Sequence, residues 1–458
     1  MIHRIDWKGW VVVAVSLAIL GLAGCGGSGG SVSGLSKRAF VSDFADGTLH
    51  IENAAIDEES EFTIATGNEP NAIALSPDKT VTLVFDTLDL SLAVVSTHLE
   101  AVQGRVGLPS PSTSYVAMSD DENGFVAVPN CPPALCGGFS NVVENLDIFM
   151  NFDISNTVTV ALNTNTGIYQ PLNVARTLVL SPTENFMLVF GGPADHQNMF
   201  TIIDTTLAEN STTVATAGTL MFGPAFDMPV WGVFTSDGTK AYILNCGPEC
   251  GGTTASVTPV DLTTTPPTAG TPVPVPSATV GLLNGTTLYV AGTPPNQSAS
   301  FCSPLAVSVC GTLSVLNTGS LASGPTATVP VSDGTHTLMS QGADNKLFIG
   351  AGPTCTNGCL SIFDTSNNQA GVDGFVNGQC PAAAACPSNV TGFAPISERS
   401  VMYVIEDVTA GTLGCSGQLP CLGKLRIYDT TAPATKPTLT PTQINVVGKA
   451  IDVKYVDQ

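Results

Sequence analysis

Charged residues are scarce in this 458-residue chain, in which Asp, Glu, Lys and Arg together make up 11%, against about 25% in typical globular proteins. Long solvent-facing helices need many such side chains, so the composition predicts little helix. Lys and Arg number only 15 against 37 Asp and Glu, which gives a net charge of −22. Because so negative a body repels phosphate backbones and no basic stripe offsets the charge, we do not expect nucleic-acid binding.

Common catalytic and cofactor motifs are also absent. The chain has no G-x-S-x-G elbow, no P-loop, no C-x-x-C pair and no C-x-x-C-H haem-attachment motif. A D-x-D-x-D-G calcium loop is missing, and residues 43–47 form only a poor fragment of one. Quinoprotein enzymes carry repeated Trp motifs and a pair of adjacent Cys residues, and this chain has neither. Trp231 is the only Trp beyond residue 24, and no two Cys residues are adjacent. The sequence therefore predicts no cofactor and no metal.

The first residues follow the pattern of an export signal. Arg4 and Lys8 precede an apolar run at 10–23. This run is shorter than the roughly 20 residues of a membrane span but typical of a signal peptide. It ends in Leu-Ala-Gly-Cys at 22–25, which matches the bacterial lipobox, and the resemblance implies lipidation of Cys25. An ordinary signal peptide with a chance Cys is the alternative.

The expected domain organisation follows from this start. We predict a lipoprotein signal peptide at 1–24, a lipidated Cys25 with a Gly/Ser-rich tether at 25–37, and a folded domain at 38–458. Gly26 after the lipidated Cys, in place of Asp, favours the outer membrane of a Gram-negative cell.

Three strand patterns recur along the chain. The first pairs an aromatic or aliphatic residue with an aliphatic one, and its eight copies begin at Ala39, Thr82, Gly124, Met187, Ala241, Leu288, Leu347 and Met402. The second is an alternating strand that ends in a small polar pair such as Asp364-Thr365. Asp at that place can bond its own backbone two residues on and start a tight turn. The third is an apolar run before a polar turn, as at 72–78 and 231–238.

Together these patterns make eight units of about 41 to 62 residues, each with four short strands, which is the signature of a β-propeller. We therefore predict an all-β fold that forms a single closed β-propeller with eight blades. Seven blades are the first alternative, because the second and third units are the most degenerate. A β-sandwich or a solenoid array is the other.

The order of strands predicts how the ring closes. The chain begins with the strand that normally follows the innermost one, at 38–43, and ends with an innermost-type strand at 450–457. The last strand is expected to complete the first blade and remove an open sheet edge.

The aromatic-Val strands, the Asp-Thr turns and the Leu-Ser-Pro-Asp stretch at 75–78 resemble the YVTN-type propeller repeats of bacterial envelope and lactonase-like proteins. The resemblance covers nearly all of the chain beyond the tether. It implies blades and an envelope setting, but no reaction, so it transfers no functional residues.

Twelve of the 13 Cys residues fall into six local couples. Isolated couples without nearby His suit disulfides of an exported protein better than zinc sites. The predicted disulfides join Cys131 with Cys136, Cys246 with Cys250, Cys302 with Cys310, Cys355 with Cys359, Cys380 with Cys386, and Cys415 with Cys421.

The predicted disulfides should gather on one face of the ring. All six couples lie in connections that emerge at the same end of the blades, whereas the opposite end is expected to carry short turns such as 76–79. The bridges are expected to stiffen long loops, and stiff surface loops commonly bind partners. Protection from proteolysis is the alternative role.

Polar residues near the starts of innermost strands are candidates for the axial channel. They are Arg176, Asp227, Asp333 and His336, of which Asp333 and His336 form the only obvious carboxylate–imidazole pair. A hydrated channel lining is the simplest interpretation of these residues, and we assign no catalytic residue.

The sequence thus predicts a membrane-anchored cell-envelope lipoprotein that acts as a binding or scaffold propeller through its disulfide-stiffened loops. A lactonase- or hydrolase-like envelope enzyme is the alternative. The expected partners are the membrane, through the lipid anchor, and another envelope protein or a surface polymer.

Overall fold

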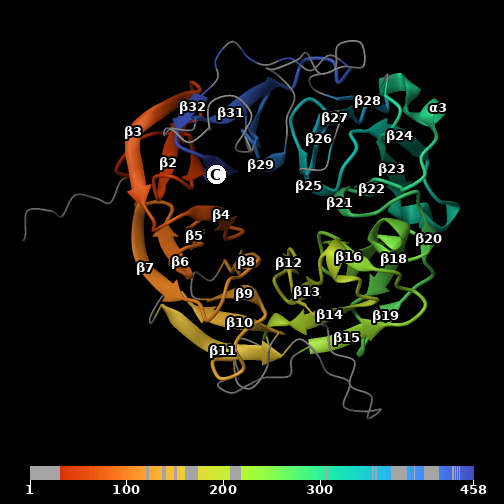
Figure 1. Cartoon of the computed structure of the whole chain (residues 1–458), viewed down its shortest axis with the longest axis horizontal. Helices are drawn as coiled ribbons and strands as arrows, with labels where there is room; N and C mark the ends of the chain where they lie inside the picture. Colours follow the sequence, from red (N-terminus) through yellow and green to blue (C-terminus); the bar gives the residue numbers. More distant parts are fainter. Residues whose placement is uncertain are drawn as a thin grey trace, which may run out of the picture.

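Each predicted unit forms one small antiparallel sheet, and the sheets stand around a common axis like the blades of a propeller (Figure 1). In the computed structural model the innermost strands surround the centre and the fourth strands lie at the rim. The described residues are 31–119, 123–136, 141–148, 152–159, 174–206, 218–305, 307–352, 355, 358–372, 389–396, 398–406, 422–435, 438, 440, 442 and 444–457.

In the first four blades, successive strands run from the axis to the rim. From the axis outwards, blade 1 contains β33 (Ala450–Tyr455), β1 (Arg38–Asp43), β2 (Thr48–Asn53) and β3 (Glu58–Ala65). Blade 2 contains β4 (Pro70–Leu75), β5 (Val81–Asp86), β6 (Ser91–Ser96) and β7 (Ala101–Gly107). Blade 3 contains β8 (Ser114–Ala117), β9 (Asn123–Pro129), β10 (Asn141–Asp147) and β11 (Asp153–Thr159). Blade 4 contains β12 (Thr177–Leu180), β13 (Phe186–Phe190), β14 (Met199–Asp204) and β15 (Gly218–Phe222).

The other four blades follow the same order. Blade 5 contains β16 (Pro229–Phe234), β17 (Lys240–Asn245) and β18 (Ser256–Asp261), with β19 (Thr268–Ala269) and β20 (Val273–Pro274) outside. Blade 6 contains β21 (Val280–Asn284), β22 (Thr287–Gly292), β23 (Gly311–Asn317) and β24 (Ala327–Val331). Blade 7 contains β25 (His336–Gln341), β26 (Lys346–Ala351), β27 (Leu360–Asp364) and β28 (Gln369–Val372). Blade 8 contains β29 (Val390–Pro395), β30 (Val401–Glu406), β31 (Leu422–Asp429) and β32 (Ile444–Val447).

The ring closes as predicted. β33 pairs antiparallel with β1, and Val41 lies opposite Val453. Blade 1 is therefore built from both ends of the folded chain, and the described residues form eight sheets, so the eight-bladed prediction is confirmed. An ion pair adds to the closure, because Arg399 of blade 8 binds the Asp57 carboxylate of blade 1.

Alternation along each strand explains how neighbouring blades pack. Phe40 joins an apolar cluster with residues of blade 2, whereas the next residue, Val41, joins a cluster with residues of blade 8. Successive side chains thus face opposite neighbours, and both faces of an inner strand are buried. This arrangement is why the chain is rich in apolar residues and poor in charge.

Four disulfides lie on one face of the ring. They are Cys131–Cys136, Cys246–Cys250, Cys302–Cys310 and Cys355–Cys359. Each follows the second strand of its blade, so all four emerge at the same end, which we call the loop face.

The two remaining predicted bridges are not among these four. Cys380 and Cys386 lie outside the described residues, and so do Cys415 and Cys421. The pairing of Cys380 with Cys386 and of Cys415 with Cys421 therefore stays a prediction.

The opposite face differs from its prediction. Short turns do link the first and second strands of the blades, but in blades 4, 6 and 8 the connection from the third to the fourth strand is longer. The connection from β23 to β24 contains the helix η4 (Thr318–Ser323), and 14 residues, 430–443, separate β31 from β32. The asymmetry between the faces therefore rests on the disulfides more than on loop length.

The predicted signal peptide and Cys25 fall outside the described residues. Within the part of the chain that is described, no helix is both long and apolar enough to cross a membrane.

Candidate functional site

A cavity of about 600 Å³ opens on the loop face between blades 4 and 5. Binding sites for small ligands span roughly 300–1,000 Å³, so its size is adequate for one. Three connections that are distant in sequence form its walls. The lining residues are Asn198, Met199, Phe222, Gly223, Pro224, Phe226, Asp227, Met228, Gly251, Gly252 and Thr253.

The Cys246–Cys250 disulfide closes the loop that forms one wall. Between the two Cys residues the chain makes the short helix η2 (Gly247–Cys250), which Gly251 ends in the left-handed region at φ 84°. Gly247 has φ 59°, and a Cβ there would lie 2.2 Å from the backbone nitrogen of Ala255. The close approach of the two chain segments therefore requires glycine, and the loop is tightly packed.

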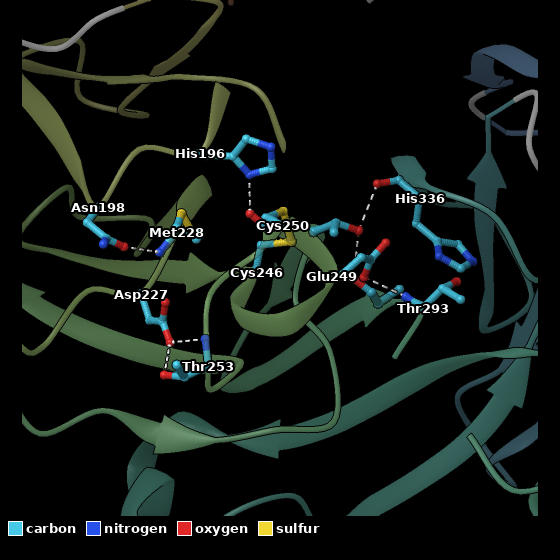
Figure 2. The surroundings of a disulfide bond; sticks show 12 residues. His196, Asn198, Asp227, Met228, Cys246, Glu249, Cys250, Thr253, Thr293 and His336 are labelled. Atoms are coloured by element: carbon cyan, nitrogen blue, oxygen red, sulfur yellow. Dashed lines mark hydrogen bonds between the residues drawn. A yellow bond between two sulfur atoms is a disulfide. The ribbon is translucent and has the colours of Figure 1, made fainter. Parts of the chain in front are cut away.

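Asp227 fixes the same wall through hydrogen bonds to the residues that follow the disulfide loop. Its Oδ2 accepts the Thr253 N–H at 2.8 Å, the Thr253 hydroxyl at 2.7 Å and the Thr254 N–H at 2.7 Å (Figure 2). Burial alone would raise the pKa of Asp227, but these hydrogen bonds outweigh burial and hold the pKa below its usual range. The predicted channel residue Asp227 is thus a loop-organising carboxylate at the rim of the cavity.

Arg176, like Asp227, binds a loop residue. It precedes β12, and its Nε lies 2.6 Å from Oδ2 of Asp195 in the helix η1 (Pro193–Asp195), with Nη2 3.1 Å from Oδ1. The adjacent His196 donates from Nδ1 to the Cys250 carbonyl oxygen at 2.5 Å, since a carbonyl only accepts (Figure 2). Arg176 therefore anchors the loop that carries His196 and Asn198, and this loop contacts the disulfide loop of blade 5.

Glu249 connects blade 5 with blade 6. Its Oε2 accepts the Thr293 N–H at 2.7 Å, and the Thr293 hydroxyl donates to the Gly334 carbonyl oxygen of the connection into blade 7 at 2.7 Å. Burial raises the pKa of Glu249 to about 7. Sequence reasoning did not single out Glu249, although its place between two bridged Cys residues was a signal that it lies in a packed loop.

The predicted residues Asp333 and His336 lie on either side of Gly334 in the chain, and both are buried. The Nε2 atom of His336 is 3.5 Å from Ser332 Oγ, and its carbonyl oxygen accepts the Thr279 hydroxyl at 2.9 Å. Burial lowers the pKa of His336 to about 4, so the imidazole is neutral near pH 7. In Figure 2 the Cys246–Cys250 disulfide lies between Asp227 on one side and His336 on the other.

A second group of buried ionisable residues lies outside the cavity, on blade 1. His50 on β2 is between the carboxylates of Asp43 and Glu59. Burial opposes a charge on His50, but the two carboxylates outweigh burial and raise its pKa to about 8. On the same strand the carboxyl of Glu52 is fully buried, and burial together with repulsion from Glu59 raises its pKa to about 8.

Comparison with known proteins supports the fold and goes no further. No family model matches the chain, and no curated protein sequence matches it. Among solved structures, dihydro-heme d1 dehydrogenase NirN in complex with DHE superposes with a TM-score of 0.60 at 11% identity, over 93% of this chain and 79% of that one. The apo form of AztD from Citrobacter koseri superposes with a TM-score of 0.51 at 10% identity, over 92% and 97%. Identities this low show a shared β-propeller fold and transfer no activity.

Proposed function

We propose that this chain is a cell-envelope lipoprotein that binds another envelope molecule through its loop face. The observation that carries the proposal is the cavity between blades 4 and 5, whose wall is a loop closed by a disulfide and held by Asp227. Loops that are ordered before binding lose less conformational entropy on association, which favours affinity. The lipobox and the YVTN-type repeats support an anchored envelope setting.

The lining of the cavity suits an amphipathic group. Met199, Phe222 and Phe226 offer apolar surface, and Asn198 and Thr253 add polar groups at the edge. Phe222 is 53% exposed, which is unusual for so large an apolar side chain and provides an anchor for a partner. A protein side chain or a sugar ring presented by a surface polymer has the required chemistry. The strongly negative chain disfavours an anionic partner.

The same lining favours binding over hydrolysis. Asp227 is the only ionisable side chain among the described lining residues. Its lowered pKa makes it a poor general base, and its Oδ2 is already occupied by three donors. A lactonase- or hydrolase-like reaction would need further groups that this cavity does not bring together.

The test is site-specific photo-crosslinking in intact cells. A photoreactive amino acid is placed at Phe222 in the cavity, and in a second strain at Leu99, which is 39% exposed on the opposite face. We expect a discrete adduct from position 222 only, and we expect Phe222→Ser to reduce co-purification of that partner while Leu99→Ser does not. Adducts from position 99 alone would place the binding surface on the opposite face.

A further inference from the structure

The turn between β1 and β2 holds a carboxylate in an unusual way. Asp43 ends β1, and its Oδ1 accepts three backbone N–H groups, from Ala45 at 2.9 Å, Asp46 at 3.3 Å and Lys449 at 2.9 Å. Its other oxygen, Oδ2, is buried and has no hydrogen-bond donor within the described residues. The hydrogen bonds to Oδ1 therefore fix the side chain in place, whereas none of them involves Oδ2.

That second oxygen faces His50. The Nδ1 atom of His50 is 2.7 Å from Glu59 Oε1, and because an ionised carboxylate only accepts, Nδ1 carries the hydrogen. The other ring nitrogen, Nε2, lies 3.3 Å from Asp43 Oδ2 and is the atom through which His50 would bind a metal ion. The His50 residue is 6% exposed, and its Nε2 makes no hydrogen bond of acceptable geometry with any described residue.

Between Nε2 and the buried carboxylate oxygen a positive charge is needed, either a proton on Nε2 or a metal ion that replaces it. A proton on Nε2 would lie in the plane of the imidazole ring, and the observed geometry does not direct it at Oδ2. A metal ion does not need that alignment, because it bonds each atom separately. Two ligand atoms bound to a tetrahedral zinc at about 2.0–2.1 Å are about 3.3 Å apart, which equals the observed separation.

A third ligand is close at hand. One carboxylate oxygen of Asp46, an exposed residue of the same turn, lies within 4.8 Å of both atoms. We propose that Asp43, Asp46 and His50 form a binding site for one divalent transition-metal ion, oriented by Glu59, at the closure of the ring. The sequence alone predicted no metal, and this site departs from that expectation.

Neighbouring residues orient the proposed ligands as they do in known metal sites. A carboxylate that accepts the Nδ1 hydrogen of a metal-binding histidine fixes the ring and strengthens its donor atom, and Glu59 occupies that position. Gly448 has φ 119°, and a Cβ there would lie 2.0 Å from Asp43 Oδ2. Only glycine leaves room for the carboxylate there, so the turn before β33 packs directly on the site.

The donor set selects the class of ion. One imidazole nitrogen with two carboxylates suits Zn²⁺ and similar first-row ions, whereas Ca²⁺ takes six to eight oxygen ligands and no imidazole. Since Lys449 N–H binds Asp43 across the closure, an ion here would hold the β1–β2 turn where the last strand enters blade 1.

The test measures Zn²⁺ binding to the intact folded domain by competition with a chromophoric chelator. Wild type should bind one Zn²⁺ per chain, and Asp46→Asn, an exposed change that leaves the fold intact, should weaken binding by more than about tenfold. His50→Gln should abolish the site, and Glu59→Gln should weaken it roughly 10- to 100-fold. X-ray absorption of the loaded protein should report one nitrogen and two or more oxygen neighbours.

The matched control is Asp237→Asn. Asp237 is an exposed carboxylate in a tight turn on the opposite face, bonded to Thr235 and Thr239. It should leave Zn²⁺ binding unchanged. If wild type binds no Zn²⁺ in the micromolar range, or if Asp46→Asn and His50→Gln bind as well as wild type, the site holds only a proton and the proposal is wrong. Neither result bears on the cavity between blades 4 and 5.

Discussion

Replacement of Glu249 by Gln should stabilise the protein at high pH and have little effect at low pH. The ordinary pKa of a glutamate is 4.5, and burial raises that of Glu249 to about 7. The folded state therefore holds a proton that the unfolded state releases between these values. Stability from this group is fully present below pH 4.5 and is lost as the pH rises through 7.

The magnitude follows from the two pKa values. Each pKa unit corresponds to about 1.4 kcal/mol, so the wild type loses about 3 kcal/mol between pH 4 and pH 8 through this group. Gln carries no charge and keeps an oxygen that accepts the Thr293 N–H. The variant should therefore gain about 3 kcal/mol relative to wild type over that range, or roughly 3 °C in Tm for a domain of this size.

The assay is a thermal melt of both proteins at several pH values, with Glu61→Gln, a change at an exposed glutamate, as the matched control. His336 acts in the opposite direction, since its pKa of about 4 makes the wild type lose stability as the pH falls below 6.5. The comparison must therefore be between variant and wild type at each pH. An equal Tm difference at pH 4 and pH 8 would refute the assignment of a buried, protonated Glu249.

Three further predictions test the architecture. Deletion of 450–457 removes β33, including Val453, which is fully buried. Because the deletion exposes two sheet edges, the truncated protein should aggregate or lose cooperative unfolding. A truncated monomer that melts like the full chain would contradict the closure. Cys25→Ser should move the protein from the membrane to the soluble fraction and abolish fatty-acid labelling, and an unchanged distribution would exclude the lipid anchor. Peptide mapping without reduction should find Cys380 bridged to Cys386 and Cys415 bridged to Cys421, and bridges between blades would show the pairing to be wrong.

Much of the architecture was predictable because its causes are local. Alternating apolar residues specify strands that are buried on both faces, and Asp-Thr pairs specify the turns that follow them. Couples of Cys separated by four to eight positions were expected to pair within their loops, as the four described bridges do. The phase of the first and last strands was enough to predict closure. Each of these conclusions depends on residues close together in the chain, or on a repeat.

The sites depended on contacts between distant segments, which a repeat pattern does not contain. Arg176 and Asp227 stand at the starts of innermost strands, as predicted, but their side chains turn to Asp195 and Thr253 in the loops. The cavity needs three connections from two blades, and the high pKa of Glu249 needs its burial against Thr293.

The closure of the ring likewise combines contacts that are local in sequence with contacts between distant segments. Asp43, Asp46 and His50 are near neighbours in sequence, yet the Lys449 N–H that fixes Asp43 comes from 406 positions away. The sequence by itself therefore determined the strands, the number of blades and the four described bridges, through side-chain alternation, turn chemistry and the spacing of Cys residues. Only the tertiary structure decided which polar groups meet, because burial and charge pairing depend on the packing of one blade against the next.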